Sequence, residues 1–147
     1  MTMLSALICI LLLAPGAQAT EAPQWLRYPA ISPDGNTVVF EYKGDLWSVP
    51  AAGGNATLLT VSDAYEFAPV WSNDGQNLAF ASDRFGNFDV FVMPATGGEA
   101  TRLTFHSTRE IPGSFTADDA AVLFSAVRQD PTCLLYTSDA ADESSRG

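Results

Sequence analysis

Short apolar runs separated by turn signals dominate the middle of this chain, and they recur at a regular spacing. The segment 28–40 carries its turn at Ser32-Pro33-Asp34-Gly35 and returns forty residues later as 68–80. Part of it returns again as 115–124, after a further forty-four residues. The second halves repeat as well: 44–54 matches 88–98, and 56–60 matches 100–104. Self-similarity at this period predicts a repeat architecture.

The second copy shows how each unit is built. Its segment Leu78 to Ser82 is apolar on both faces, as expected of a strand between two neighbouring layers. Turns follow from Asn73-Asp74-Gly75 and from Pro94 to Gly98, where glycine supplies a positive φ. The four expected strands are Ala68–Ser72, Leu78–Ser82, Asp89–Met93 and Ala100–Phe105. Four strands in about 42 residues is the period of a β-propeller blade.

The offset between copies grows from forty to forty-four at one place, Asp83 to Asn87, as a hairpin turn tolerates. No segment between Thr20 and Thr132 has a helical periodicity long enough for a βαβ unit. The sequence therefore predicts an all-β fold, an incomplete β-propeller of two and a half four-stranded blades. Because ring closure takes four to eight blades, we expect these blades to belong to a six- or seven-bladed ring.

The amino-terminal segment differs from the repeats and predicts export. Leu4 to Ala14 is an apolar run, and Ala17-Gln18-Ala19 follows it as a small-x-small triplet. This pattern is typical of a secretory signal, here residues 1–19, with cleavage after Ala19. The run is too short to span a bilayer, and a buried amphipathic helix is disfavoured because every face is apolar. We expect a periplasmic or extracellular protein with no stable membrane span after cleavage.

The carboxy-terminal segment 133–147 breaks every preceding pattern. Cys133 to Glu143 resembles the conceptual translation of a transposase-type sequencing adapter over eleven consecutive residues. The alternative is a natural polar terminus. We interpret 133–147 as a non-native tail that packs against nothing and forms no repeat-like strand, which leaves 20–132 as the partial propeller. That middle segment contains no cysteine, so an exported domain of this kind must be held by its core.

Composition narrows the classes of partner. The formal net charge is −10, which argues against nucleic acid, because phosphate binding needs clustered Lys and Arg. The acidic residues are spread thinly, as expected for solubility rather than a binding tail. One His and two distant Cys provide no zinc motif. We expect no cofactor and no metal.

The repeat resembles the WD-like propeller blades of the TolB family. The likeness rests on the aromatic-Ser-Pro-Asp-Gly turn, the Leu78-Ala79-Phe80 strand and the Ala100–Thr104 exit, and it covers Tyr28 to about Ser125. It implies the fold more strongly than any function, since such blades serve enzymes and binding proteins alike.

A narrower likeness is to exported tricorn-type serine peptidases, of the carboxy-terminal-processing kind. It is carried by Trp25–Gly35, Tyr42–Trp47 and Ala81–Phe91. The resemblance implies that a second β domain, a PDZ-like module and a peptidase domain with a catalytic Ser follow the propeller. It also implies that the propeller filters or guides unfolded peptides. None of the family's catalytic residues maps onto this chain, and the repeat departs from its pattern at Asn73, where Pro is usual, and at Asp119, where Gly is expected.

Candidate site residues all have structural interpretations that we prefer. His106, followed by Ser107, lies in an inter-blade connection with no recognisable nucleophile–base–orienter set. Asp34, Asp74 and Asp118 occupy the same turn of successive blades, where Asp bonds the local backbone. The remaining candidates are Asp83 and Asp89 as solvated hairpin residues, Trp47, Trp71, Phe91 and Phe115 as core, Asn55-Ala56-Thr57 as an unused glycosylation pattern, and Gly53-Gly54 and Gly97-Gly98 as turns. We therefore assign no catalytic, cofactor-binding or metal-binding residue.

Three hypotheses for function stay open. The first is the non-catalytic propeller of an exported tricorn-like serine peptidase, binding peptides. The second is a TolB-like propeller that binds a protein partner in the periplasm. The third is a propeller fused to a different hydrolase. The segment of the gene that follows residue 132 discriminates among them.

We expect the mature protein to begin at Thr20, outside the cytoplasm, because signal peptidase cleaves after a small-x-small triplet. Amino-terminal sequencing of protein recovered from the periplasm or medium measures this. Retention of residues 1–19 on a cytoplasmic protein would contradict the prediction.

Overall fold

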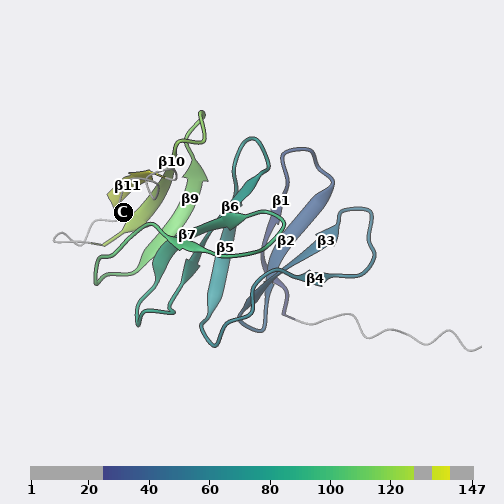
Figure 1. Cartoon of the computed structure of the whole chain (residues 1–147), viewed down its shortest axis with the longest axis horizontal. Coiled ribbons are helices and arrows are strands. Elements are labelled where there is room, and N and C mark those ends of the chain that lie inside the picture. The colour runs from purple at the N-terminus through teal and green to yellow at the C-terminus, as the bar shows by residue number, and fades with distance from the viewer. Residues whose placement is uncertain (1–24, 128–133, 140–147) are drawn as a thin grey trace, which may run out of the picture.

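The structure is a computed structural model that describes residues 25–127 and 134–139 (Figure 1). The predicted signal segment 1–19 and its cleavage site lie outside these residues. Every regular element in the described part of the chain is a β-strand, as predicted. The strands are β1 (Arg27–Ile31), β2 (Thr37–Tyr42), β3 (Asp45–Pro50), β4 (Thr57–Leu58), β5 (Glu66–Trp71), β6 (Asn77–Ser82), β7 (Asp89–Pro94), β8 (Thr101–Arg102), β9 (Glu110–Phe115), β10 (Ala121–Ala126) and β11 (Leu134–Asp139).

The strands form three antiparallel meanders, which we call blades 1, 2 and 3. Blade 1 has the order β1-β2-β3-β4, blade 2 the order β5-β6-β7-β8, and blade 3 the order β9-β10-β11. Local chemistry sets each hairpin. In the β2–β3 turn, for example, Lys43 and Gly44 both have positive φ, 56° and 94°, as a two-residue turn matched to the strand twist requires. The incomplete propeller predicted from the sequence is confirmed.

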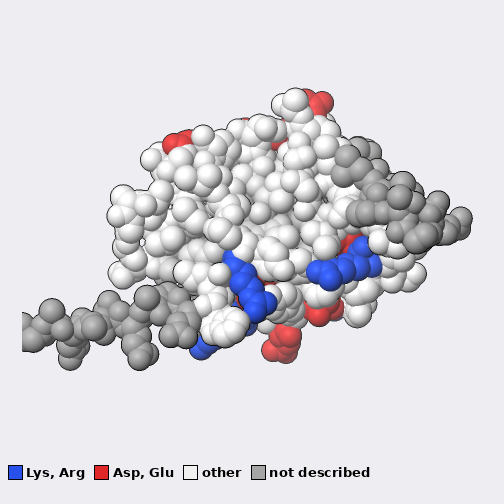
Figure 2. Space-filling model, turned by 180° about the vertical axis from the view of Figure 1, so that it is seen from behind, with Lys and Arg blue, Asp and Glu red and all other residues white. Residues whose placement is uncertain are grey.

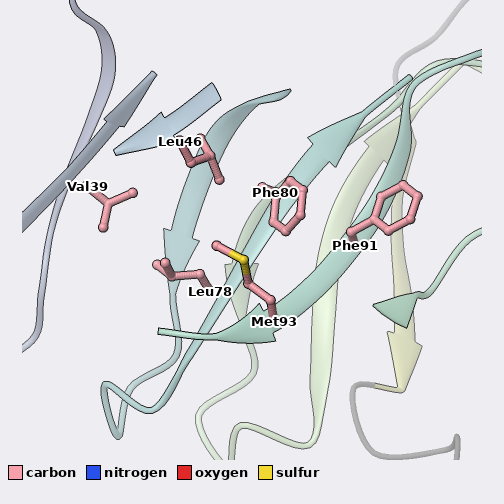
Figure 3. Close-up of a cluster of buried hydrophobic side chains, with 6 residues drawn as sticks. All are labelled: Val39, Leu46, Leu78, Phe80, Phe91 and Met93. Carbon is pink, nitrogen blue, oxygen red and sulfur yellow. The ribbon is translucent and has the colours of Figure 1, made fainter. Parts of the chain in front are cut away.

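Blades 1 and 2 stack through a cluster of fully buried side chains (Figure 3). Leu78 and Phe80 of β6 point toward blade 1, while Ala79 between them packs against blade 3. This alternation follows from the two-residue period of a strand and explains why β6 is apolar on both faces. Burying a side chain such as Phe80 contributes roughly 1.5–3 kcal/mol. The cluster between blades 1 and 2 is Val39, Leu46, Leu78, Phe80, Phe91 and Met93.

A second cluster joins blade 2 to blade 3. It is formed by Ala79, Val90, Phe115, Val122, Phe124 and Ala126. The first strands of the blades lie next to one another, since β1 contacts β5 and β5 contacts β9. Blade 2 thus presents one face to blade 1 and the other to blade 3, as in a propeller.

The passage from one blade to the next repeats in detail. The amide of Glu66 donates to the carbonyl of Gly44 at 2.8 Å, and that of Glu110 donates to Phe88 at 2.7 Å. The threonine that ends each blade, Thr60 or Thr104, is buried. Its Oγ1 accepts a hydrogen bond from the backbone N–H of Leu46 (2.9 Å) or, in blade 2, of the equivalent Val90. The repeated Thr therefore satisfies a buried donor at each exit.

One expectation for the tail was wrong. Leu134–Asp139 forms β11 and pairs with β10 along its whole length, from Ala121↔Asp139 to Ala126↔Leu134. The physical reason is the open edge of β10, whose N–H and C=O groups pair readily with any extended segment that reaches them. The non-native origin of 133–147 stays a prediction, because strand pairing does not report on origin.

We expect residues 20–132 expressed alone to associate rather than to form a clean monomer. Val38 and Phe40 of blade 1 hold the positions that Leu78 and Phe80 hold in blade 2, but they line a shallow apolar groove of about 330 Å³ on the outward face. Uncovered faces and open edges recruit other chains. Size-exclusion chromatography with circular dichroism measures this. A sharp monomer peak with a cooperative thermal transition would contradict it.

Candidate functional site

The repeated aspartates organise their own turns. In each blade the hydroxyl of Ser32, Ser72 or Thr116 donates to the Asp two residues later at 2.5–2.6 Å. The hydrogen bond from Ser32, with those from the backbone and side chain of Asn36, lowers the pKa of Asp34 to about 2. The pKa of Asp118 is lowered in the same way by Thr116 and the N–H of Ala120. The local hydrogen bonding predicted for these aspartates is present.

The two departures from the repeat, Asn73 and Asp119, contact each other across blades 2 and 3. The backbone N–H and the Nδ2 of Asn73 each donate to Oδ1 of Asp119 at 2.7 Å, and the N–H of Asp74 donates to Oδ2 at 2.9 Å. Desolvation raises the pKa of Asp119, but these donors outweigh it and hold the pKa below its usual value. We call this contact the Asn73–Asp119 clasp. Sequence reasoning took each departure separately and missed their pairing.

The corresponding contact between blades 1 and 2 is apolar. Pro33 stands where blade 2 has Asn73, and Gly75 stands where blade 3 has Asp119. A Cβ added at Gly75 would lie 3.6 Å from Cδ of Pro33, so the ring of Pro33 packs beside the glycine. Asp119 adopts the same left-handed conformation as Gly75, with φ of 56° against 72°. Asp tolerates this region better than most residues.

The expectation that Asp83 and Asp89 are solvated was wrong for Asp89. Its side chain is fully buried and pairs with Nη2 of Arg102 at 2.7 Å. Burial raises the pKa of Asp89, and the Arg102 guanidinium opposes that shift. Asp83 accepts a hydrogen bond from the N–H of Tyr65 at 2.8 Å. The reason for the error is Arg102 of β8, whose guanidinium reaches the Asp89 carboxylate at the start of the neighbouring strand β7.

The insertion in the β6–β7 hairpin completes this ion pair. The ring of Phe85, from the inserted segment, lies 4.6 Å from the Arg102 guanidinium, and Phe105 lies 4.7 Å from it. Aromatic faces stabilise a cation in this position. On the face of the molecule shown in Figure 2, basic side chains lie close to acidic ones.

Further buried carboxylates lie at the start of β5 and at the end of β2. Glu66 is fully buried and forms an ion pair with Arg84, and Glu41 accepts the N–H of Gly44 at 2.8 Å. Burial raises the pKa of the Tyr65 phenol, and the neighbouring Glu41 raises it further. Sequence analysis missed these groups. The one available signal was that Glu66 and Glu110 recur at the forty-four-residue offset.

His106 lies in the connection between blades 2 and 3, as predicted. Its ring is exposed, and Nδ1 lies 3.0 Å from Oγ1 of Thr108. Its carbonyl accepts a hydrogen bond from Nδ2 of Asn87 at 2.8 Å. The backbone N–H of Thr108 also donates to Nδ1, at 3.2 Å. Among residues 25–127, no group of three or more His, Cys, Asp or Glu side chains is placed to hold a metal ion.

The repeated aromatic residues belong to the packing between blades, with one exception. Phe91 and Phe115 are buried, and Trp71 packs against the first cluster while its Nε1 donates to the carbonyl of Ala30 at 3.1 Å. Trp47 is only half-buried, and its Nε1 donates to the carbonyl of Tyr42 at 3.3 Å. It lies on the outward side of blade 1, which no described blade covers. Asn55 is exposed, and the glycine pairs have positive φ, as turns require.

A groove of about 760 Å³ opens between blades 1 and 2, at the end of the sheets where the Asp turns lie. Polar side chains of both blades line it together with Trp71. They include Thr37, Ser48, Thr57, Asp34, Asp74 and Gln76. The lining of this groove suits binding rather than covalent chemistry.

Comparison with known proteins identifies the architecture. A family model described as the tricorn protease N-terminal β-propeller domain matches residues 23–138. The chain belongs to this family. "Tricorn protease homolog 1" of Streptomyces coelicolor is 35% identical over 77 residues, which are 52% of this chain and 7% of that protein. The chain therefore aligns with only a small part of that relative.

Solved structures show the same fold. A TolB-like protein from Agrobacterium tumefaciens superposes with a TM-score of 0.71 at 22% identity, covering 80% of this chain and 43% of that one. The crystal structure of the tricorn protease superposes with a TM-score of 0.55 at 12% identity, covering 76% and 12%. No helix capable of crossing a membrane occurs among the residues described here.

We expect Arg102→Leu, which copies Leu58 at the equivalent position of blade 1, to destabilise the propeller by about 3–5 kcal/mol, because it leaves the buried Asp89 carboxylate unpaired. The double variant Asp89→Asn/Arg102→Leu removes the charge and should recover much of the loss. Urea unfolding of the complete gene product at neutral pH measures both. A single variant as stable as the wild type would show that the ion pair contributes nothing.

Proposed function

We propose that this domain is the non-catalytic N-terminal propeller of an exported tricorn-like serine peptidase, and that it guides or filters peptide substrates. The observation that carries the proposal is the family match over residues 23–138. The amino-terminal signal pattern supports export. The peptidase activity of the whole protein, its substrates and its partners belong to the proposal.

The structure of the described blades is compatible with a guiding role. Around His106 they pair the imidazole with the Thr108 hydroxyl in an exposed connection, which differs from the Ser-His-Asp arrangement of a serine hydrolase. They offer instead a rigid scaffold in which buried ion pairs hold the inserted hairpin and a polar groove runs between two blades. Such a scaffold can present peptides to a site elsewhere in the same protein.

The test uses the complete gene product. We expect the gene to continue into further blades, a PDZ-like module and a peptidase domain with a catalytic Ser, and the protein to cleave unfolded polypeptides. A Ser→Ala change at that nucleophile abolishes cleavage and serves as the control. A variant that lacks the propeller should lose its preference for unfolded over folded substrates. An open reading frame that stops after the last blade, or one that encodes no peptidase, would overturn the proposal.

A second candidate is a TolB-like propeller that binds a protein partner outside the cytoplasm. The Agrobacterium structure, with a TM-score of 0.71, shares this fold. A stop codon soon after the ring selects this candidate. A propeller fused to another hydrolase, the third hypothesis, is selected by a metal-binding or α/β domain in the same place.

A further inference from the structure

The two crevices between successive blades differ although the blades are repeats. Half-buried apolar side chains pack against both clusters: Val70, Val92 and Leu103 between blades 2 and 3, and Leu59, Trp71, Ala95 and Ala100 between blades 1 and 2. The difference lies at the rim and at the polar positions beside it. The Asn73–Asp119 clasp closes the rim between blades 2 and 3. Between blades 1 and 2 the rim is the apolar contact of Pro33 with Gly75, and the groove of about 760 Å³ opens beside it. The repeat has therefore diverged at its inter-blade surface.

The divergence follows particular residues. Ser48, which lines the groove, corresponds to Val92, which packs against the cluster between blades 2 and 3, and Gln76 corresponds to Ala120. Ser48 is paired with Val39 in the β2–β3 register, so its side chain points toward blade 2. The exchange replaces apolar side chains with groups that form hydrogen bonds. Packing between blades does not require these polar residues, since their apolar counterparts Val92 and Ala120 are accommodated between blades 2 and 3.

The lining groups are available to a ligand. Ser48, Thr57 and Gln76 make no side-chain hydrogen bond to any residue within the described ranges, and all three line the groove. Hydroxyl and carboxamide groups both donate and accept, as the alternating N–H and C=O groups of an extended polypeptide require. The volume lies within the range of small-ligand sites, about 300–1,000 Å³.

The charge at the rim points to a basic ligand. Asp34 and Asp74 line the groove, and the pKa of Asp34, near 2, keeps that carboxylate ionised at neutral pH. No Lys or Arg is among the lining residues. The indole of Trp71 forms part of the wall, and aromatic faces attract cations.

We propose that the groove between blades 1 and 2 binds an extended polypeptide segment that carries Lys or Arg. The proposal rests on the proposed function, because it names the class of peptide that the propeller takes. The hydroxyl and amide groups contact the peptide backbone, and the carboxylates at the rim contact the basic side chain.

The experiment measures binding to the complete gene product by fluorescence anisotropy. The probes are a labelled unstructured peptide of Gly, Ser and Lys and its counterpart with every Lys replaced by Glu. We expect the Lys peptide to bind at least tenfold more tightly, with an advantage that falls as salt rises. Equal binding of the two peptides would overturn the proposal.

The variants copy residues that the repeat already tolerates. Ser48→Val and Gln76→Ala install the blade 2 and blade 3 counterparts and should together weaken binding of the Lys peptide about tenfold, or about 1.4 kcal/mol, with unchanged thermal unfolding. Thr57→Val and Thr101→Val form a matched pair at equivalent positions, of which only Thr57 lines the groove. Loss of affinity in Thr57→Val alone supports the proposal, and equal effects of the pair overturn it.

Failure of this inference is distinguishable from failure of the proposed function. Groove variants that leave Lys-peptide affinity unchanged overturn the inference even if the protein cleaves unfolded polypeptides. Binding that depends on the groove supports the inference even if no cleavage occurs, and then only the peptidase proposal falls.

Discussion

Burial of β6, the second strand of blade 2, on both of its faces is the constraint on which the rest of this structure depends. A single sheet cannot cover its own two faces. Because β6 is apolar on both faces, it requires a blade on either side. Leu78 and Phe80 meet blade 1, and Ala79 meets blade 3. The alternation of large and small residues sets the stacking order: the large side chains of one blade fill the space left by the small ones of its predecessor.

Buried charged side chains lie at the ends of strands in these blades. Glu66 and Asp89 are fully buried, and each meets an arginine from a neighbouring segment of the same blade. The inserted hairpin adds Phe85 over Arg102, which shields one pair from water. Buried pairs of this kind add little net stability but penalise any arrangement that separates the partners. They fix the position of the hairpin relative to β8.

The sequence predicted those features that depend on local chemistry or on period. The blades, the Asp turns and the glycine positions follow from residues within a few positions of each other, where hydrogen bonding and φ preferences act directly. Contacts between distant residues were not predictable. Asn73 and Asp119 are separated by forty-six residues. Asp89 was predicted to be solvated because no residue near it in the sequence indicates that Arg102 pairs with it. β11 was missed because an open strand edge accepts partners without regard to pattern.

The two rims also limit how this gene can change by recombination between its repeats. Excision of one blade by crossover would bring Pro33 directly beside Asp119. Proline has no backbone N–H and no side-chain amide, so Asp119 would lose the donors that Asn73 supplies while keeping its left-handed backbone. The blades look alike in the printed sequence, yet the two described rims are not interchangeable. A deletion that removed blade 2 would therefore leave the carboxylate of Asp119 without its present donors.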